Sequence, residues 1–398
     1  MTLDTQNKSN KIKYTIISLL LLFLLIIVME QLISPTDQLS MLLTVLKKGA
    51  IYALVAVSMN LLNGFTGLFS LGQAGFMLIG AYFYAIFTIP VADRDSVYMY
   101  YDSAVNFSFP ESLQNLIGGP GMILGVVVAV ILAGLIAALV AFLIGLPVLR
   151  LKSDYLAIAT LGFAEILRAV FQWGRLGPVT NGSNPLRNFV RQNAFVIDFG
   201  SFSLSMSTFV IVFFAAICIG VIVLLVNSSY GRAFKAIRED DIAAEAMGIN
   251  LYRHKQMAFC ISSFFTGVGG ALLAIFMGSV IASNFKAAMT YELLLIVVLG
   301  GIGSISGSVI GALLFVFASE WWLRGLDSGT FLGISIPLFR NGFRLVVFSL
   351  IIMCVVLFFR KGIMGDKELP YMLNHWKKKI LTLVNRSKTV PEAGDSND

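Results

Sequence analysis

Long apolar runs separated by short polar segments dominate this chain of 398 residues. Runs of about 18 or more apolar residues are typical of helices that cross a membrane. Only helices and closed barrels can pair every backbone group in lipid, and these runs lack the period-two alternation of barrel strands. The pattern therefore predicts an all-α polytopic membrane protein. About ten spans are expected, at 14–33, 49–63, 74–89, 121–147, 155–172, 207–227, 256–281, 289–300, 304–323 and 342–359.

The polar segments between these runs set the domain organisation. The longest are 90–120, 173–206, 228–255 and the tail after 360. None of them is long enough for a soluble catalytic domain. We expect one transmembrane domain over 14–365, with an N-terminal segment 1–13 and a tail 366–398 on the same side of the membrane. The first apolar run ends without an A-x-A-like cleavage site, so we expect the first span to stay uncleaved.

Charged residues are scarce and unevenly placed. They make up 13% of the chain, and the net charge is +7; soluble domains carry about a quarter. Basic residues gather at both termini and in 228–255, whereas 90–120 is acidic. The positive-inside rule then predicts cytoplasmic termini and explains the net charge, so no nucleic-acid partner is expected. Lys47 and Lys48 lie on the opposite predicted side and do not fit the rule.

Two apolar regions are interrupted by clusters of glycine. The first cluster consists of Gly64, Gly67, Gly72 and Gly75, and the second of Gly300, Gly301, Gly303 and Gly307. Paired interruptions point to a path through the membrane, because non-helical backbone can line a polar cavity. The alternative is close helix packing through small residues, which we favour for Gly307 and Gly311. The path interpretation selects as candidates Asn63, Gly67, Gln73, Gly301 and Gly303.

An ionisable pair falls within the fifth predicted span. Glu165 is expected near the middle of the membrane, where charge is costly and usually functional. Arg168 follows at i+3 spacing, so the two side chains can neutralise each other. A structural ion pair and a place on the path therefore both stay open for Glu165.

Small residues recur at every fourth position of the fourth predicted span. The stripe consists of Gly121, Gly125, Ala129, Ala133, Ala137, Ala141 and Gly145. Such a row lets the backbone of another helix approach closely. We expect it to pack against another part of this chain or against a second subunit.

The segment 230–250 is polar and long enough for a helix outside the bilayer. Small and apolar residues are interspersed with charges along it, and a helix stop is expected at Gly248. A short helix of this kind can dock in a groove on another protein. The alternative is an ordinary amphipathic helix at the membrane surface.

Five sequence blocks, taken in order, resemble one known family. They are 59–76, 149–168, 231–250, 297–307 and 358–365. The chain is similar to permease subunits of ABC importers for branched-chain amino acids, in particular to the M-type membrane subunit that pairs with a sister permease. The resemblance implies a permease domain over 14–365 with glycine-broken helices, in the bacterial inner membrane.

The resemblance also implies partners and residue roles. The segment 230–250 would be a coupling helix that docks on a cytoplasmic ATPase, through Arg232, Arg238, Glu239, Ala244, Glu245 and Gly248. The implied partners are ATPase subunits, a sister permease and an extracytoplasmic solute-binding protein, with lipid around the spans. ATP would be bound by the partner subunits, since this chain has no G-x-x-x-x-G-K-[ST] loop.

The chain departs from the family pattern in three places. The block 180–185 has different residues, Gln73 stands where a histidine is usual, and 90–120 is longer. If these positions meet the solute, the cargo can instead be urea, an amide or another small polar compound. A secondary transporter working alone is the rival outside the class, and it would need intramembrane coupling residues, of which the sequence offers few.

Catalytic and metal chemistry is not expected. The chain has two histidines, both beside lysines, and three cysteines, all inside apolar runs. These residues supply neither a catalytic set nor a metal-ligand pattern, and they imply no disulfide framework. We therefore expect a transport subunit that is not an enzyme and that holds no cofactor of its own.

Overall fold

The computed structural model describes residues 23–32, 40–118, 121–151, 153–198 and 203–322, with short pieces at 330–331, 334–335, 347, 349–350, 353, 357, 362–365 and 368. The predicted N-terminal segment 1–13, most of the tenth predicted span and most of the tail lie outside the described residues. What the sequence predicts for these segments therefore stays a prediction.

Helices make up most of the described chain, which confirms the all-α prediction. The long helices are α2 (Ser40–Asn60), α3 (Gln73–Thr88), α6 (Gly121–Val148), α7 (Ser153–Gln172), α9 (Ser207–Val226), α12 (Leu251–Met277), α13 (Ala287–Gly300) and α14 (Ile305–Phe317). Five helical stretches, with α2 extended to Phe65, are long and apolar enough to cross a membrane. Phe23–Leu32 is a shorter apolar helix. Two small hairpins, which the sequence did not predict, pair β1 (Val196–Asp198) with β2 (Ser203–Ser205) and β3 (Thr330–Phe331) with β4 (Ile334–Ser335).

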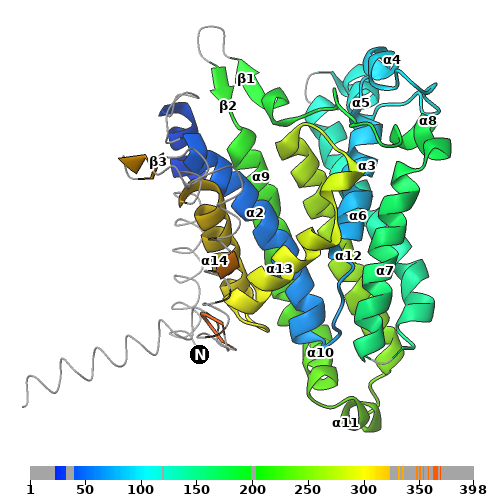
Figure 1. Ribbon diagram of the computed structural model, residues 1–398, viewed down its shortest axis with the longest axis vertical. Coiled ribbons are helices and arrows are strands. Elements are labelled where there is room, and N and C mark those ends of the chain that lie inside the picture. The colour runs from blue at the N-terminus through cyan, green and yellow to red at the C-terminus, as the bar shows by residue number, and fades with distance from the viewer. Residues whose placement is uncertain are drawn as a thin grey trace, which may run out of the picture.

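Short helices occupy the two ends of the bundle (Figure 1). One end carries α10 (Ser229–Glu239) and α11 (Asp241–Ala246). The other end carries α4 (Arg94–Val97), α5 (Phe109–Ile117), α8 (Gly177–Thr180) and the β1–β2 hairpin. The basic segment 228–255 and the acidic segment 90–120 therefore lie at opposite ends, as their charges predict.

The centre of the bundle is α12, which packs against α6, α3 and α2. Its approach to α6 uses the predicted stripe of small residues, all seven of which are buried. A Cβ on Gly267 of α12 would lie 2.5 Å from the Ala137 methyl, and a Cβ on Gly125 would lie 2.4 Å from Pro110 of α5. The stripe thus packs against helices of this same chain.

The second span begins earlier than predicted, at Ser40 instead of 49. Lys47 and Lys48 consequently lie within α2, where their charges are balanced. The Lys47 ammonium is 3.9 Å from the Glu30 carboxylate and donates to Gln192 Oε1 at 3.1 Å, and Lys48 pairs with Glu320. Gln192 and Glu320 lie 145 and 272 residues away in the chain, so local sequence gave no sign of them.

Two of the departures from the family pattern meet at the end opposite α10. The Tyr98 hydroxyl donates to the Val179 carbonyl at 2.8 Å, and Asn181 Nδ2 donates to the Val97 carbonyl at 3.0 Å. Burial raises the pKa of Tyr98 to about 12, so this phenol keeps its proton and its hydrogen bond. The longer segment 90–120 is thus built onto 177–185.

Candidate functional site

The two glycine-rich interruptions lie against each other. The α2 helix continues as a π-helix over Leu61–Phe65, and a loop over 66–72 then leads to α3, while 301–304 separates α13 from α14. Asn60 joins them: its Oδ1 accepts from the Gly303 amide at 2.8 Å, and its Nδ2 donates to Ser304 O at 3.0 Å and Ser308 Oγ at 2.8 Å. We call 61–72 the first break and 301–304 the second break.

Glycine is required in both breaks for physical reasons. A Cβ on Gly64 would lie 1.9 Å from Asn60 Oδ1 and 2.6 Å from the Gly303 nitrogen. Gly67, Gly301 and Gly303 have φ angles of 73°, 119° and 90°, which L side chains rarely adopt. The sequence prediction that the glycines interrupt the helices is therefore confirmed. Gly307 and Gly311 have the predicted packing role, because a Cβ on either would meet the backbone of α13.

The turn 362–365, near the C-terminal end of the described residues, packs against the second break. Ile363 N donates to Leu299 O at 2.8 Å, and a Cβ on Gly301 would lie 2.5 Å from Gly365 O. Glu368 accepts from the amides of Ile305 at 2.8 Å and Ser306 at 3.1 Å. A carboxylate at this position caps the first turn of α14 and complements its dipole.

The segment 230–250 forms two helices where one was expected. Asp240 ends α10 and caps α11, because its carboxylate accepts from the amides of Ile242 at 2.8 Å and Ala243 at 3.0 Å. The helix stop predicted at Gly248 is confirmed by its φ of 86° and by the hydrogen bond from Ile249 N to Ala244 O at 3.1 Å.

Arg238 connects α10 to the first break. Its Nη1 donates to the Gly64 carbonyl at 2.9 Å, and a Cβ on Gly67 would lie 3.1 Å from its Cγ. A Cβ on Gly303 of the second break would lie 3.0 Å from Nη1. A polar groove of about 440 Å³ opens beside it, between the first break, the turn after α6 and the ends of α10 and α12. A displacement of α10 would therefore act directly on residues of both breaks.

The other predicted coupling residues differ in exposure. Arg232, Glu239 and Glu245 are exposed, and Arg232 donates to the Ser229 hydroxyl at 3.0 Å. Ala244 is 4% exposed and faces the chain itself, so its position does not support direct contact with a partner. Sequence reasoning missed Ile242 and Met247, which are 81% and 84% exposed. Large apolar residues within a charged segment were the available signal.

Two path candidates form internal hydrogen bonds. Gln73 is 1% exposed, and its Oε1 accepts from Thr266 Oγ1 at 2.6 Å, which ties α3 to α12. Asn63 bridges the first break internally, since its Oδ1 accepts from the Ser70 amide at 3.1 Å. In this conformation both side chains hold the break in shape.

The α7 helix contacts the first break and the start of α13. Thr160 Oγ1 accepts from the Leu71 amide of the first break at 3.0 Å. Glu165 pairs with Arg168 at 2.6 Å and also accepts from the Ala287 amide at the start of α13 at 3.1 Å. Glu165 thus has structural partners on two helices, while its side chain stays 36% exposed.

Sequence reasoning also missed Asn60 and Glu368. Asn60 is a polar residue in an apolar run, four positions before Gly64, and that was a usable sign. Glu368 follows the last sequence block by three positions and gave no local sign of its role. Among the residues that the structure describes, no group of three His, Cys, Asp or Glu side chains could hold a metal ion.

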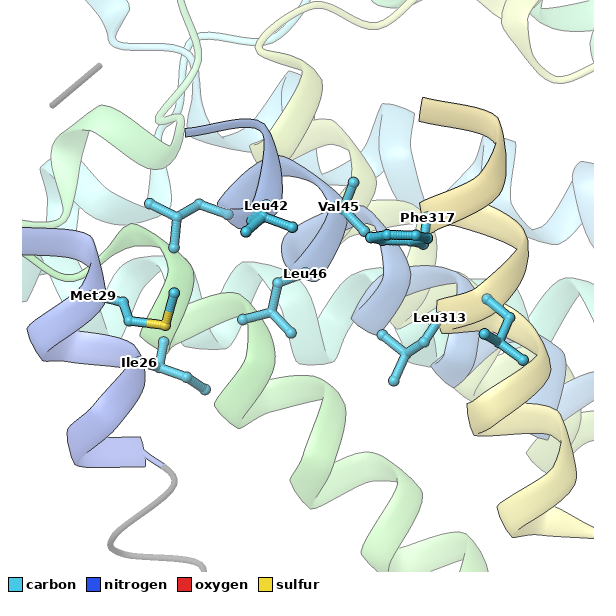
Figure 2. A pocket seen from close by; sticks show the side chains of 9 residues that line it. Ile26, Met29, Leu42, Val45, Leu46, Leu313 and Phe317 are labelled. Atoms are coloured by element: carbon cyan, nitrogen blue, oxygen red, sulfur yellow. The ribbon is translucent and has the colours of Figure 1, made fainter. Parts of the chain in front are cut away.

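An apolar pocket lies away from the two breaks. It has a volume of about 510 Å³ and lies between the helix Phe23–Leu32, α2 and α14 (Figure 2). All nine of its side chains are apolar, including Ile26, Leu46 and Phe317. A polar solute would find no partner there, so this pocket is not the candidate site.

Comparisons with known proteins agree with the resemblance drawn from the sequence blocks. Residues 41–358 match the family described as the permease component of the branched-chain amino acid transport system. The chain is 32% identical over 291 residues to the high-affinity branched-chain amino acid transport system permease protein LivM of Escherichia coli, and 30% identical to that of Salmonella typhimurium. Each match covers 68% of this chain and 61% of the relative.

More distant relatives extend this picture. A probable LivM permease of Methanocaldococcus jannaschii is 24% identical over 347 residues, which is 84% of this chain and 96% of that protein. The permease protein LivH of Escherichia coli is 30% identical over 172 residues, covering 42% of this chain and 51% of the relative. No solved structure matches the chain.

Proposed function

The chain belongs to the family of permease components of branched-chain amino acid transport systems, and we propose that it is the membrane-spanning subunit of an ATP-driven importer for branched-chain amino acids. The relatives named LivM support the cargo, although the matched region covers 61% of the bacterial ones. Urea or an amide carried by the same machinery is the alternative cargo, which a panel of solutes would distinguish.

The contact between Arg238 and the first break is the observation that carries this proposal. Work done outside the membrane can reach the spans only through a rigid element that touches them. The α10 helix is such an element, because Arg238 bonds Gly64 and packs on Gly67. We propose that a cytoplasmic ATPase docks on α11, with Ile242 and Met247 as its apolar contacts, and moves α10 against the breaks.

The remaining partners follow from the family. We propose a sister permease, a second ATPase copy and an extracytoplasmic solute-binding protein, with the chain in the bacterial inner membrane and both termini in the cytoplasm. Relatives of both the LivM and the LivH kind support a pair of related permeases. ATP would be hydrolysed by the separate subunits.

Uptake measurements in a strain that lacks the native copy test the proposal. The full chain should restore uptake of radiolabelled L-leucine, whereas Glu245→Lys and Arg238→Gln should abolish it with the same amount of protein in the membrane. Arg253→Glu is the matched control, since it reverses an exposed charge at the same end outside α10 and α11. Normal uptake in both coupling variants would contradict the docking role.

Gly248→Arg should also abolish uptake, but its interpretation differs. Gly248 has a φ of 86° and caps α11, so arginine there strains the backbone as well as changing the surface. Affinity purification in mild detergent completes the test. Co-elution of ATPase subunits and a second permease supports the assignment, and ATP-independent solute movement by the chain alone in liposomes would overturn it.

A further inference from the structure

A second cavity, with charged and apolar walls, lies at the end of the bundle opposite α10 and α11. It has a volume of about 350 Å³ and is lined by α2, the C-terminal turns of α12 and the start of α13. The loop between α12 and α13 is joined to the segment 173–198, because Val280 and Leu186 exchange backbone hydrogen bonds at 3.0 and 2.8 Å. In Figure 1, α13 lies in front, between α14 and α7.

The walls of this cavity combine opposite charges with apolar surface. Lys48, Lys286 and Glu292 line it together with Leu273, Phe276 and Met289. Lys48 is already paired with Glu320 and lies 5.5 Å above the ring of Tyr52. Lys48 also acts on Glu292, so the two cations Lys48 and Lys286 are balanced by the two anions Glu292 and Glu320 around the cavity.

Lys286 and Glu292 are both exposed to the cavity, and the charge of Lys48 acts on Glu292. Neither side chain makes a hydrogen bond or an ion pair with another described residue. Ionisable side chains that line a cavity beside membrane-spanning helices often serve a function. A ligand with only a negative charge would leave the charge of Glu292 without a partner, and a ligand with only a positive charge would leave that of Lys286 without one.

We propose that this cavity binds a zwitterionic amino acid with an apolar side chain. Glu292 faces the ammonium, Lys286 faces the carboxylate, and the wall of Leu273, Phe276 and Met289 accepts the side chain. The volume lies within the range of about 300–1,000 Å³ that is usual for small-molecule sites. This inference rests on the proposed transport function and assigns a position along its path.

Protection of an introduced cysteine from a thiol reagent tests the site. The variant is Ala288→Cys, at a position that lines the cavity, in the full chain after Cys218, Cys260 and Cys354 have been changed to serine. L-Leucine should slow the reaction of the introduced thiol with a cationic methanethiosulfonate in membrane vesicles. The analogues 4-methylpentanoate, which lacks the ammonium, and 3-methylbutylamine, which lacks the carboxylate, should not protect.

Charge-neutralising variants then test the two named groups. Glu292→Gln and Lys286→Gln should each raise the half-protecting concentration of leucine by about tenfold or more, since each removes one charged hydrogen bond. Asp95→Cys in place of Ala288→Cys is the control, because Asp95 is exposed at the same end outside the cavity. Its reaction rate should not respond to leucine.

The outcomes separate this inference from the proposed function. Equal protection by either analogue, or an unchanged half-protecting concentration in both charge variants, would overturn the assignment. Absence of protection in a chain that supports leucine uptake would remove the cavity and leave the transport proposal standing. Protection in a chain that supports no leucine uptake would keep the cavity and remove the transport proposal.

Discussion

The two breaks are built from the same kind of residue but are held differently. The first break is long, contains a π-helix and is contacted by Arg238 from α10. The second break is short and is held by backbone contacts with the turn 362–365 and by the Glu368 cap on α14. Asn60 bonds the one to the other.

The two breaks also differ in the elements that contact them. The first break includes the loop 66–72, and α10, which contacts the break through Arg238, lies at one end of the molecule. The second break has positive-φ glycines between Asn60 on one side and the turn 362–365 with Glu368 on the other. We infer that α10 moves the first break and that Asn60 transmits this movement to the second.

The largest effect is expected where the two breaks touch. Gly64→Ala places a methyl within van der Waals overlap of Asn60 and the Gly303 backbone, and backbone cannot yield as a flexible side chain can. We expect the free energy of unfolding to fall by about 3 kcal/mol, measured as a lower thermal midpoint in detergent. Gly162→Ala is the control, since nothing lies within 4 Å of its Cβ. An unchanged midpoint for Gly64→Ala would show that the breaks can separate.

The next effect concerns the link itself. Asn60→Ala removes the acceptor for the Gly303 amide and the donor to Ser304 and Ser308. Asn60 itself is fully buried. Buried groups left unpaired cost about 2 kcal/mol. Asn63→Ala should cost less, because Asn63 bonds only within the first break and is partly exposed. A larger fall in the thermal midpoint for Asn63→Ala than for Asn60→Ala would show that Asn60 is not the main link between the two breaks.

The comparison also shows what local sequence could predict. The glycine clusters revealed both breaks, because several glycines close together let the backbone leave helical geometry. The polar composition of 230–250 likewise revealed a segment outside the spans. The division at Asp240 was missed although the side chain is a good N-cap, since a continuous run of helix-forming residues surrounds it.

What could not be predicted depends on residues distant in sequence. The start of α2 was misplaced because the partners of Lys47 and Lys48 are supplied by other segments. Asn60 was overlooked because Gly303 and Ser308 lie more than 240 residues away. The cavity beside Glu292 needs three helices at once, so no local pattern could reveal it.

A smaller effect is expected at the second break alone. Glu368→Gln keeps the shape of the side chain but removes the charge that faces the first turn of α14. A charged cap of this kind contributes about 1 kcal/mol. The thermal midpoint should fall slightly, and leucine uptake should fall with it if the second break must be held fixed. Full uptake at a lowered midpoint would mean that the turn stabilises the chain without serving transport.

The smallest effects are expected at α7, which contacts the first break through Thr160 and the start of α13 through Glu165. Glu165→Gln keeps an acceptor for the Ala287 amide but loses the ion pair with Arg168, which is partly exposed and worth about 0.5 kcal/mol. Thr160→Val removes the acceptor for the Leu71 amide of the first break and should cost about 1 kcal/mol. Both are measured as thermal midpoints beside uptake of leucine and of urea. A stable Glu165→Gln protein with a changed preference between these solutes would place Glu165 on the path, because a purely structural ion pair has no means of distinguishing one solute from another.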